Sequence, residues 1–196
     1  MGAVTVMLAG VGGQGTILAA DVLAKVAAAA GLDVKLSEVH GMAQRGGAVD
    51  TVVRFGDEVF SPLTDPGGAD HLVAFEMIEA ARRLPFLKPD GRLLVNTRVI
   101  QPLPVLIGAA EVPDALEARL DAEGAIFLDA EALACEAGSP KSANVVLLGG
   151  LSTGLDFEEG LWREVIAARV PPKTRDVNMR AFELGRQACG EGECYL

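Results

Sequence analysis

A run of glycines near the start of the chain is the first feature that could bind a ligand. It follows an apolar stretch, residues 4–9, and precedes an alanine-rich one, residues 16–30. Glycines at such a junction let the backbone turn sharply and leave amide groups at the positive end of a following helix open to an anion. The residues of this candidate anion loop are Gly10, Gly12, Gly13, Gln14, Gly15 and Thr16. The alternative interpretation is a tight turn without a ligand.

The spacing of these glycines also fits the G-x-G-x-x-G fingerprint of dinucleotide-binding domains. In that fingerprint an acidic residue after the second strand binds a ribose. Glu38 stands near the end of the next apolar stretch, where that acid is expected. A stand-alone protein that binds NAD or FAD is therefore one hypothesis.

A second glycine-rich segment, residues 38–47, carries the other candidate side chains. His40, Gln44 and Arg45 lie among its glycines. An arginine can hold a carboxylate or phosphate through two parallel hydrogen bonds, and a histidine titrates near neutral pH. The segment could thus position an anionic substrate. Alternatively, Arg45 pairs with Glu38 or another acid, and His40 caps the loop by hydrogen bonds.

The elements around these loops predict a mixed sheet. A strand at 4–9, a helix at 16–30 and a strand at 34–39 form a parallel crossover unit. Only eight residues then precede the next strand, at 48–55, which is too few for a crossover helix. That strand must turn back, so the sheet departs from the dinucleotide plan. A tight turn at 56–58 predicts a hairpin into residues 59–60, and the two glycine loops should be neighbours.

The rest of the chain continues the α/β pattern. We expect a second parallel unit and several C-terminal helices, with the turn of that unit at Pro89-Asp90-Gly91. The fold class is α/β, a three-layer α/β/α arrangement with a mixed, mostly parallel sheet and a Rossmann-like start, in one domain over residues 1–196. The expected elements are strands at 71–75, 92–95, 105–107 and 125–128 and helices at 77–84, 144–151, 158–169 and 176–188.

Composition excludes several classes of function. The net charge is -10, which disfavours binding to nucleic acid or to an anionic membrane surface. No apolar stretch approaches the roughly 20 residues of a membrane-spanning helix, and no signal sequence is visible, so we expect a cytoplasmic protein. Cys135, Cys189 and Cys194 form no C-x-x-C pair, which argues against a metal or cluster site and favours a buried thiol at Cys135. No familiar catalytic motif appears.

A local basic excess stands out in the last part of this acidic chain. Residues 161–190 contain Arg163, Arg169, Lys173, Arg175, Arg180 and Arg186. Such a segment is either a solvated helical surface or a docking surface for an acidic partner.

Residues 10–15 and residues 37–49 together resemble a known family. The second stretch reads Ser-Glu-Val-His-Gly-Met-Ala-Gln-Arg-Gly-Gly-Ala-Val. The chain is similar to the gamma-type subunits of 2-oxoacid:ferredoxin oxidoreductases, and within them to the indolepyruvate ferredoxin oxidoreductase beta subunit. The likeness continues at residues 53–56, 61–62, 84–89, 91, 95–97, 144–145, 148–149, 170–171, 173–174, 178 and 180–185.

This resemblance implies a supporting subunit of a larger enzyme. Such complexes oxidatively decarboxylate a 2-oxo acid, pass electrons through iron-sulfur clusters to ferredoxin and form an acyl-CoA. Thiamine diphosphate, its Mg and the clusters would belong to partner subunits, with no cofactor bound by this chain alone. Gln44 and Arg45 would face the substrate carboxylate or the phosphates of CoA. A purely structural scaffold is the third hypothesis.

Overall fold

The computed structural model describes residues 2–41 and 46–190, and its centre is a six-stranded sheet. The strands are β1 (Val4–Val11), β2 (Asp33–His40), β3 (Ala48–Gly56), β4 (Ala69–Ala74), β5 (Leu87–Asn96) and β6 (Ala125–Leu128). The helices are α1 (Thr16–Ala29), α2 (Met77–Arg83), α3 (Leu103–Leu106), α4 (Leu116–Asp121), α5 (Ala130–Ala137), α6 (Ala143–Ser152), α7 (Glu159–Arg169) and α8 (Arg175–Gly190). Short 3-10 turns η1 (Leu84–Phe86), η2 (Pro140–Ser142) and η3 (Pro172–Thr174) join some of them.

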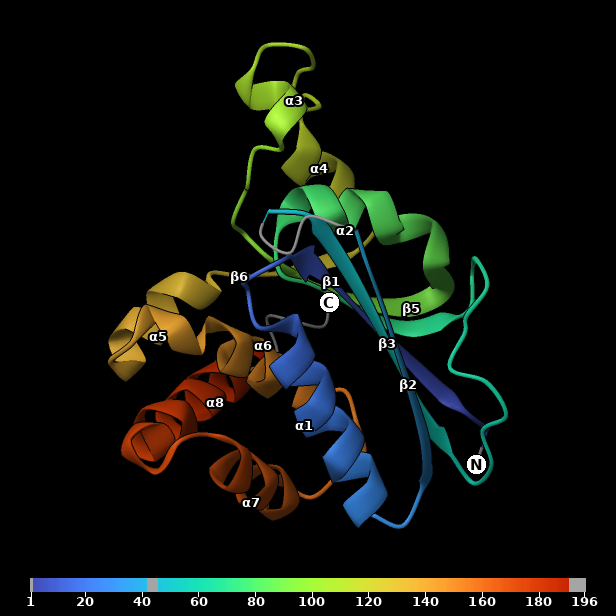
Figure 1. Ribbon diagram of the computed structural model, residues 1–196, viewed down its shortest axis with the longest axis vertical. Helices are drawn as coiled ribbons and strands as arrows, with labels where there is room; N and C mark the ends of the chain where they lie inside the picture. The colour runs from blue at the N-terminus through green and yellow to red at the C-terminus, as the bar shows by residue number, and fades with distance from the viewer. Residues whose placement is uncertain (1, 42–45, 191–196) are drawn as a thin grey trace.

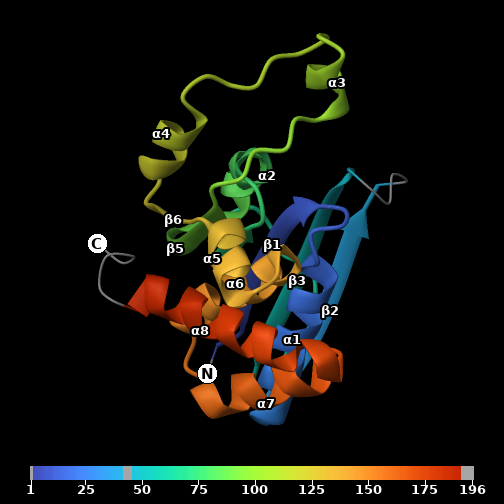
Figure 2. The same ribbon diagram turned by 90° about the vertical axis from the view of Figure 1, so that its left-hand side faces the viewer.

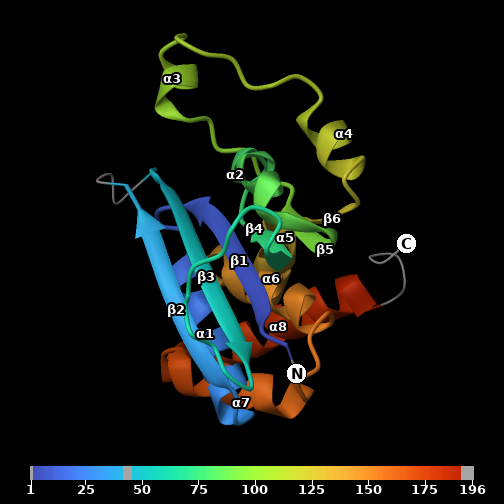
Figure 3. The same ribbon diagram turned by 90° about the vertical axis from the view of Figure 1, so that its right-hand side faces the viewer.

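The strand order β2-β3-β1-β4-β5-β6 confirms the mixed sheet. β3 runs antiparallel to both of its neighbours, β1 and β2, whereas β1, β4, β5 and β6 pair in parallel. The strand after the second glycine loop therefore turns back, as the short connection predicts. β2 runs in the same direction as β1, but the two strands are not neighbours, because β3 lies between them (Figure 3).

Helices cover the two faces of the sheet unequally. The larger core lies under α1, α5, α6, α7 and α8, and it contains the fully buried Trp162 and Phe182. The smaller core lies under α2 and α4 on the other face (Figures 1 and 2). Over β3 on this second face, Arg54 holds the loop after the strand through its Nη1, which donates to the carbonyls of Ser61 and Leu63 at 2.9 Å each. The expected three layers are thus confirmed.

α6 and α8 cross at two glycines that let their backbones touch. A Cβ built on Gly149 would lie 2.2 Å from the carbonyl oxygen of Phe182, and one on Gly185 would lie 2.0 Å from that of Val146. Real Cβ atoms do not come so close to backbone oxygens. The apolar C-terminal helices can therefore pack this tightly because neither residue has a side chain.

Several local expectations are wrong. Residues 59–60 form no strand; instead, the Val59 amide donates to the Asp33 carboxylate at 2.9 Å. The expected strand at 105–107 belongs to the excursion around α3, a short helix. The turn at 89–91 lies within β5, where the register with β4 shifts. Cys135 is exposed and Cys189 is buried, whereas Cys194 lies outside the described residues. The sequence pattern does not predict α5.

His71 on β4 is a buried histidine, and it gives the fold a pH dependence. Burial, with a smaller contribution from the nearby Arg92 charge, lowers the pKa of His71 from 6.5 to about 4. Between these values the unfolded chain binds the proton and the folded chain does not, so stability rises with pH through this window.

We therefore expect the wild-type protein to lose roughly 3 kcal/mol of unfolding free energy relative to His71→Gln as the pH falls from 7 to 4. The variant has no proton to gain at this position. Urea unfolding, followed by the fluorescence of the buried Trp162, measures the difference. A difference between the two proteins that stays constant across the range would contradict the assignment.

Candidate functional site

The two glycine loops are neighbours, as expected. The amide of Gly12 donates to the carbonyl of Gly47 at 2.8 Å, and the amide of Gly46 donates to the carbonyl of Gly12 at 3.4 Å. These bonds extend the pairing of β1 with β3 past Val11 and Ala48. Both loops therefore lie at the same end of the sheet, where β1 and β2 finish.

Backbone geometry explains why glycine is needed in the first loop. Gly13 and Gly15 have φ of 105° and 82°, the left-handed region that favours glycine. Gly15 also meets α6, because its Cβ would lie 2.6 Å from the Asn144 side-chain nitrogen. No side chain of the described residues caps the start of α1. The amides there remain available to an anion.

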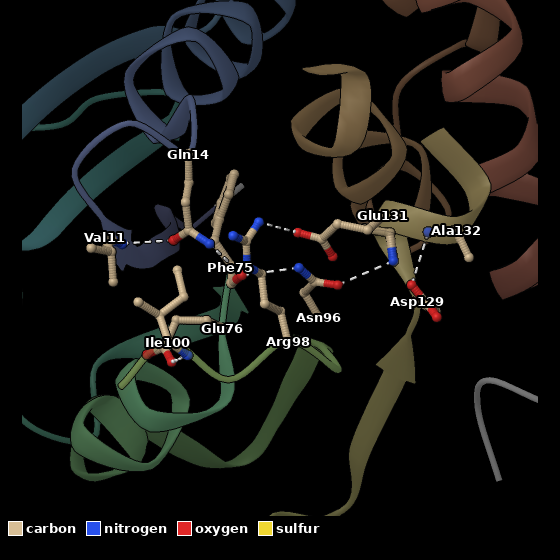
Figure 4. Close-up of polar contacts among 11 residues, drawn as sticks. Val11, Gln14, Phe75, Glu76, Asn96, Arg98, Ile100, Asp129, Glu131 and Ala132 are labelled. Atoms are coloured by element: carbon tan, nitrogen blue, oxygen red, sulfur yellow. Dashed lines mark hydrogen bonds and ion pairs between the residues drawn. The ribbon is translucent and has the colours of Figure 1, made fainter. Parts of the chain in front are cut away.

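Gln14 closes the loop instead of facing out of it. Its Oε1 accepts from the Val11 amide at 2.7 Å, and its Nε2 donates to the Phe75 carbonyl at 2.9 Å (Figure 4). Thr16 is almost completely buried. Of the residues predicted for this loop, the glycine amides are thus better placed for a ligand than these two side chains.

The second loop is described only at its ends. His40 is half exposed; its Nε2 lies 3.5 Å from Glu38 Oε1, and its Nδ1 lies 3.2 Å from the carbonyl of Gly41. Gln44 and Arg45 lie outside the described residues. Glu38 is separated from β1 by the whole of β3. In a dinucleotide-binding domain the ribose-binding acid ends a strand next to the first one, so Glu38 is displaced from that position.

A cavity of about 560 Å³ opens beside the first glycine loop. It lies at the ends of β1, β4 and β5, where the chain order of the sheet changes direction, which is the usual place for a ligand in open α/β sheets. The starts of α1, α5 and α6 all contribute to its wall. The polar residues that line it are Gln14, Asn96, Arg98, Glu131, Lys141 and Asn144.

Asn96 ties together the elements around this cavity. The residue is 1% exposed; its Nδ2 donates to the Phe75 carbonyl at 3.0 Å, and its Oδ1 accepts from the Ala130 amide at 3.1 Å (Figure 4). The Phe75 carbonyl thus accepts from both Asn96 and Gln14. Through it, the glycine loop, the end of β4 and the start of α5 are held in one network.

Arg98 brings a permanent positive charge to the cavity. Its Nη1 lies 2.9 Å from Oε1 of Glu131, with the two side chains 50% and 31% exposed. The backbone of the same segment is fixed, since the Arg98 carbonyl accepts from the Met77 amide at 2.9 Å. The buried carboxylate of Glu76 holds the next part of the segment by accepting from the Ile100 amide at 3.2 Å (Figure 4).

The arrangement favours a negative ligand. In the described part of the lining, Arg98 and Lys141 outnumber the carboxylate of Glu131, and the positive ends of α1, α5 and α6 add to them. Within residues 2–41 and 46–190, no group of His, Cys, Asp and Glu side chains could hold a metal ion. The cavity can therefore bind and orient an anion, but the lining residues that the structure describes offer no nucleophile paired with a base.

Sequence reasoning missed Asn96, Arg98, Lys141 and Asn144 as site residues. A signal existed for two of them, because Asn96 and Asn144 both fall in the stretches that carry the family likeness. In the basic C-terminal segment, residues 161–190, acidic side chains neutralise several of the arginines. Arg163 and Arg186 pair with Glu159 at 2.7 and 3.3 Å, and Arg169 pairs with Asp21 of α1.

Known proteins match this chain over nearly its whole length. The family model for pyruvate ferredoxin/flavodoxin oxidoreductase matches residues 5–188. The indolepyruvate oxidoreductase subunit IorB of Thermococcus kodakarensis is 45% identical, with 95% of this chain and 96% of that protein covered. Its counterpart from Pyrococcus horikoshii is 42% identical, with the same coverage.

The fold also matches a solved structure. The pyruvate oxidoreductase subunit PORC of Thermotoga maritima superposes with a TM-score of 0.70 at 26% identity, covering 94% of this chain and 96% of that one. No helix in the part of this chain that the structure describes is long and apolar enough to cross a membrane.

Proposed function

This chain belongs to the pyruvate ferredoxin/flavodoxin oxidoreductase family, and from that premise we propose that it is a subunit of a ferredoxin-dependent 2-oxoacid oxidoreductase. The complex would oxidatively decarboxylate a 2-oxo acid to an acyl-CoA. The observation that carries the proposal is the identity of 45% to an indolepyruvate oxidoreductase subunit over almost all of both chains. An indolepyruvate-like substrate, with an aryl side chain, is the class we assign.

The chemistry of the reaction would come from partner subunits. The donor set of the described residues does not fit a metal or a cluster, since no group of His, Cys, Asp and Glu lies together. We therefore assign thiamine diphosphate, its Mg and the iron-sulfur clusters to the partners, which would pass electrons to ferredoxin. This chain would be inactive alone.

Its own contribution would be to bind an anionic group beside the partner's reaction centre. The cavity offers loop amides at the start of α1, together with Arg98 and Lys141, to a carboxylate of the substrate or a phosphate of CoA. Asn96 and Gln14 would hold the glycine loop and the start of α5 in place through the Phe75 carbonyl. His40, Gln44 and Arg45, with Glu38 nearby, would face the same ligand or the partner chain from the second loop.

Reconstitution tests the subunit role. The thiamine-binding subunit, prepared without this chain, is mixed with it, and CoA-dependent reduction of ferredoxin is measured with indolepyruvate, pyruvate and 2-oxoglutarate. We expect turnover only when both proteins are present, and the highest kcat/KM for indolepyruvate. Turnover by this chain alone, or full turnover by the partner alone, would contradict the proposal.

The two other hypotheses predict different results. A stand-alone nucleotide-binding protein would bind NADH, NADPH or FAD at micromolar concentration. It has no support from the similar proteins, and the position of Glu38 beyond β3 argues against it. A purely structural scaffold would keep normal turnover in the complex after substitutions at the cavity, such as Arg98→Gln.

A further inference from the structure

The anion-binding cavity contains a carboxylate of the protein itself. Among the described residues that line it, Glu131 is the one acidic side chain. It stands in the first turn of α5, after the N-cap Asp129, and its Oε1 lies 2.9 Å from Nη1 of Arg98 (Figure 4). The cavity thus holds, within its own wall, the kind of group that it is built to receive.

The position of Glu131 is favourable without any ligand. A carboxylate in the first turn of a helix is stabilised by the helix dipole, and it is stabilised again here by the guanidinium. Arg98 has no comparable second support, because its side chain is 50% exposed and Glu131 is its partner among the described residues. A ligand anion that binds Arg98 through Nη1 therefore competes with Glu131 for that nitrogen.

We propose that Glu131 is a competitor built into the site: it holds Arg98 while the cavity is empty and releases it when an anionic ligand enters. The inference rests on the proposed anion-binding function of the cavity. Glu131 then determines the affinity and the specificity of the cavity for its ligand. Its substitution should strengthen binding, which is the opposite of what the loss of a binding residue does.

The strength of the ion pair makes such an exchange feasible. Pairs with exposed side chains contribute about 0.2–1 kcal/mol, so the release of Arg98 from Glu131 costs little. A ligand with one carboxylate gains little by replacing another carboxylate. A phosphate carries more charge and more acceptor oxygens, so it gains more from Arg98 and the loop amides. Glu131 should therefore favour phosphate groups over carboxylates.

The test is a double-mutant cycle on the full-length chain, with inorganic pyrophosphate as the probe and pyruvate as the carboxylate arm. Isothermal titration calorimetry compares the wild type with Glu131→Gln, Arg98→Gln and the double variant. Glu136→Gln is the matched control, because it removes the same charge from an exposed position on the same helix. Thermal unfolding of each variant checks that the fold is kept.

We expect Glu131→Gln to bind pyrophosphate about two- to fivefold more tightly than the wild type and Glu136→Gln to bind it equally. Arg98→Gln should bind roughly tenfold more weakly. In that background the gain from Glu131→Gln should shrink, because there is no guanidinium left to release. Pyruvate should bind more weakly than pyrophosphate to the wild type. The ratio of the two dissociation constants should be smaller for Glu131→Gln.

Three outcomes would overturn the inference. One is a Glu131→Gln variant that binds no more tightly than the wild type. Another is an equal gain with and without Arg98, which would reduce Glu131 to a general repulsive charge. The third is a wild-type chain that binds neither probe. If that chain still assembles into an active complex, the proposed subunit function is retained, but anion binding in the cavity and the role of Glu131 are both contradicted.

Discussion

Replacing Gly185 by alanine is expected to destabilise the protein by about 3 kcal/mol or more. The new Cβ would lie 2.0 Å from the carbonyl oxygen of Val146 and 2.8 Å from its carbonyl carbon, and backbone atoms inside α6 cannot move aside as a flexible side chain can. The two helices must separate, which opens the larger core around the buried Phe182. Urea unfolding followed by the fluorescence of Trp162, the one tryptophan of the chain, measures the loss.

Gly160→Ala is the control for this substitution. Gly160 lies in the first turn of α7, and nothing stands within 4 Å of the Cβ that the variant would add. Because alanine is the better helix former, this variant should be as stable as the wild type or more stable by up to roughly 1 kcal/mol. Equal stability of Gly185→Ala and Gly160→Ala would show that α6 and α8 do not cross as closely as described.

Replacing Asn96 by alanine is expected to lower the unfolding free energy by roughly 2–3 kcal/mol and to weaken pyrophosphate binding about tenfold or more. The substitution leaves the buried Ala130 amide without its acceptor and takes one of two side-chain donors from the Phe75 carbonyl. The start of α5 and the glycine loop then lose their common anchor. Chemical unfolding and calorimetric titration measure the two effects separately.

Asn178→Ala serves as the matched control. Asn178 also donates from its side chain to a backbone carbonyl, that of Thr174 at 2.8 Å, but it lies on α8, away from the cavity. The Asn178→Ala substitution should lower the free energy of unfolding by about 1 kcal/mol and leave the affinity for pyrophosphate unchanged. If Asn96→Ala loses stability but keeps full affinity, Asn96 supports the fold without positioning the site.

The sequence predicts the first part of the fold well because local rules decide it. The connection between β2 and β3 is too short for a crossover helix, so β3 had to reverse, and the mixed sheet and adjacent glycine loops followed. Local rules fail where tertiary contacts decide. Residues 59–60 look like the second arm of a hairpin, but β1 and β2 already occupy both edges of β3, and the Val59 amide donates to the Asp33 carboxylate instead.

The candidate site was only partly predictable for the same reason. The glycine loop lies in one continuous stretch, so its spacing is visible in the sequence. Gln14 looks like a ligand-binding side chain beside that loop, yet one of its partners is the carbonyl of Phe75, which is 61 positions away. Arg98 and Glu131 meet across 33 positions, and no sequence motif joins them. Their pairing follows from the parallel order of β4, β5 and β6.

The wall of the cavity has a consequence for biosynthesis. Asn144 at the start of α6 donates to the Gly15 carbonyl at the start of α1, a contact that spans 129 positions. A nascent chain on the ribosome can complete the glycine loop early, but it lacks the opposite side of the cavity until α6 has emerged from the exit tunnel. Such distant contacts form slowly, because the entropy cost of closing a long loop comes before the contact can stabilise the chain. Anion binding should therefore begin only after translation is almost finished. A chain truncated before α6 would expose the amides of the glycine loop but would lack the opposite wall of the cavity.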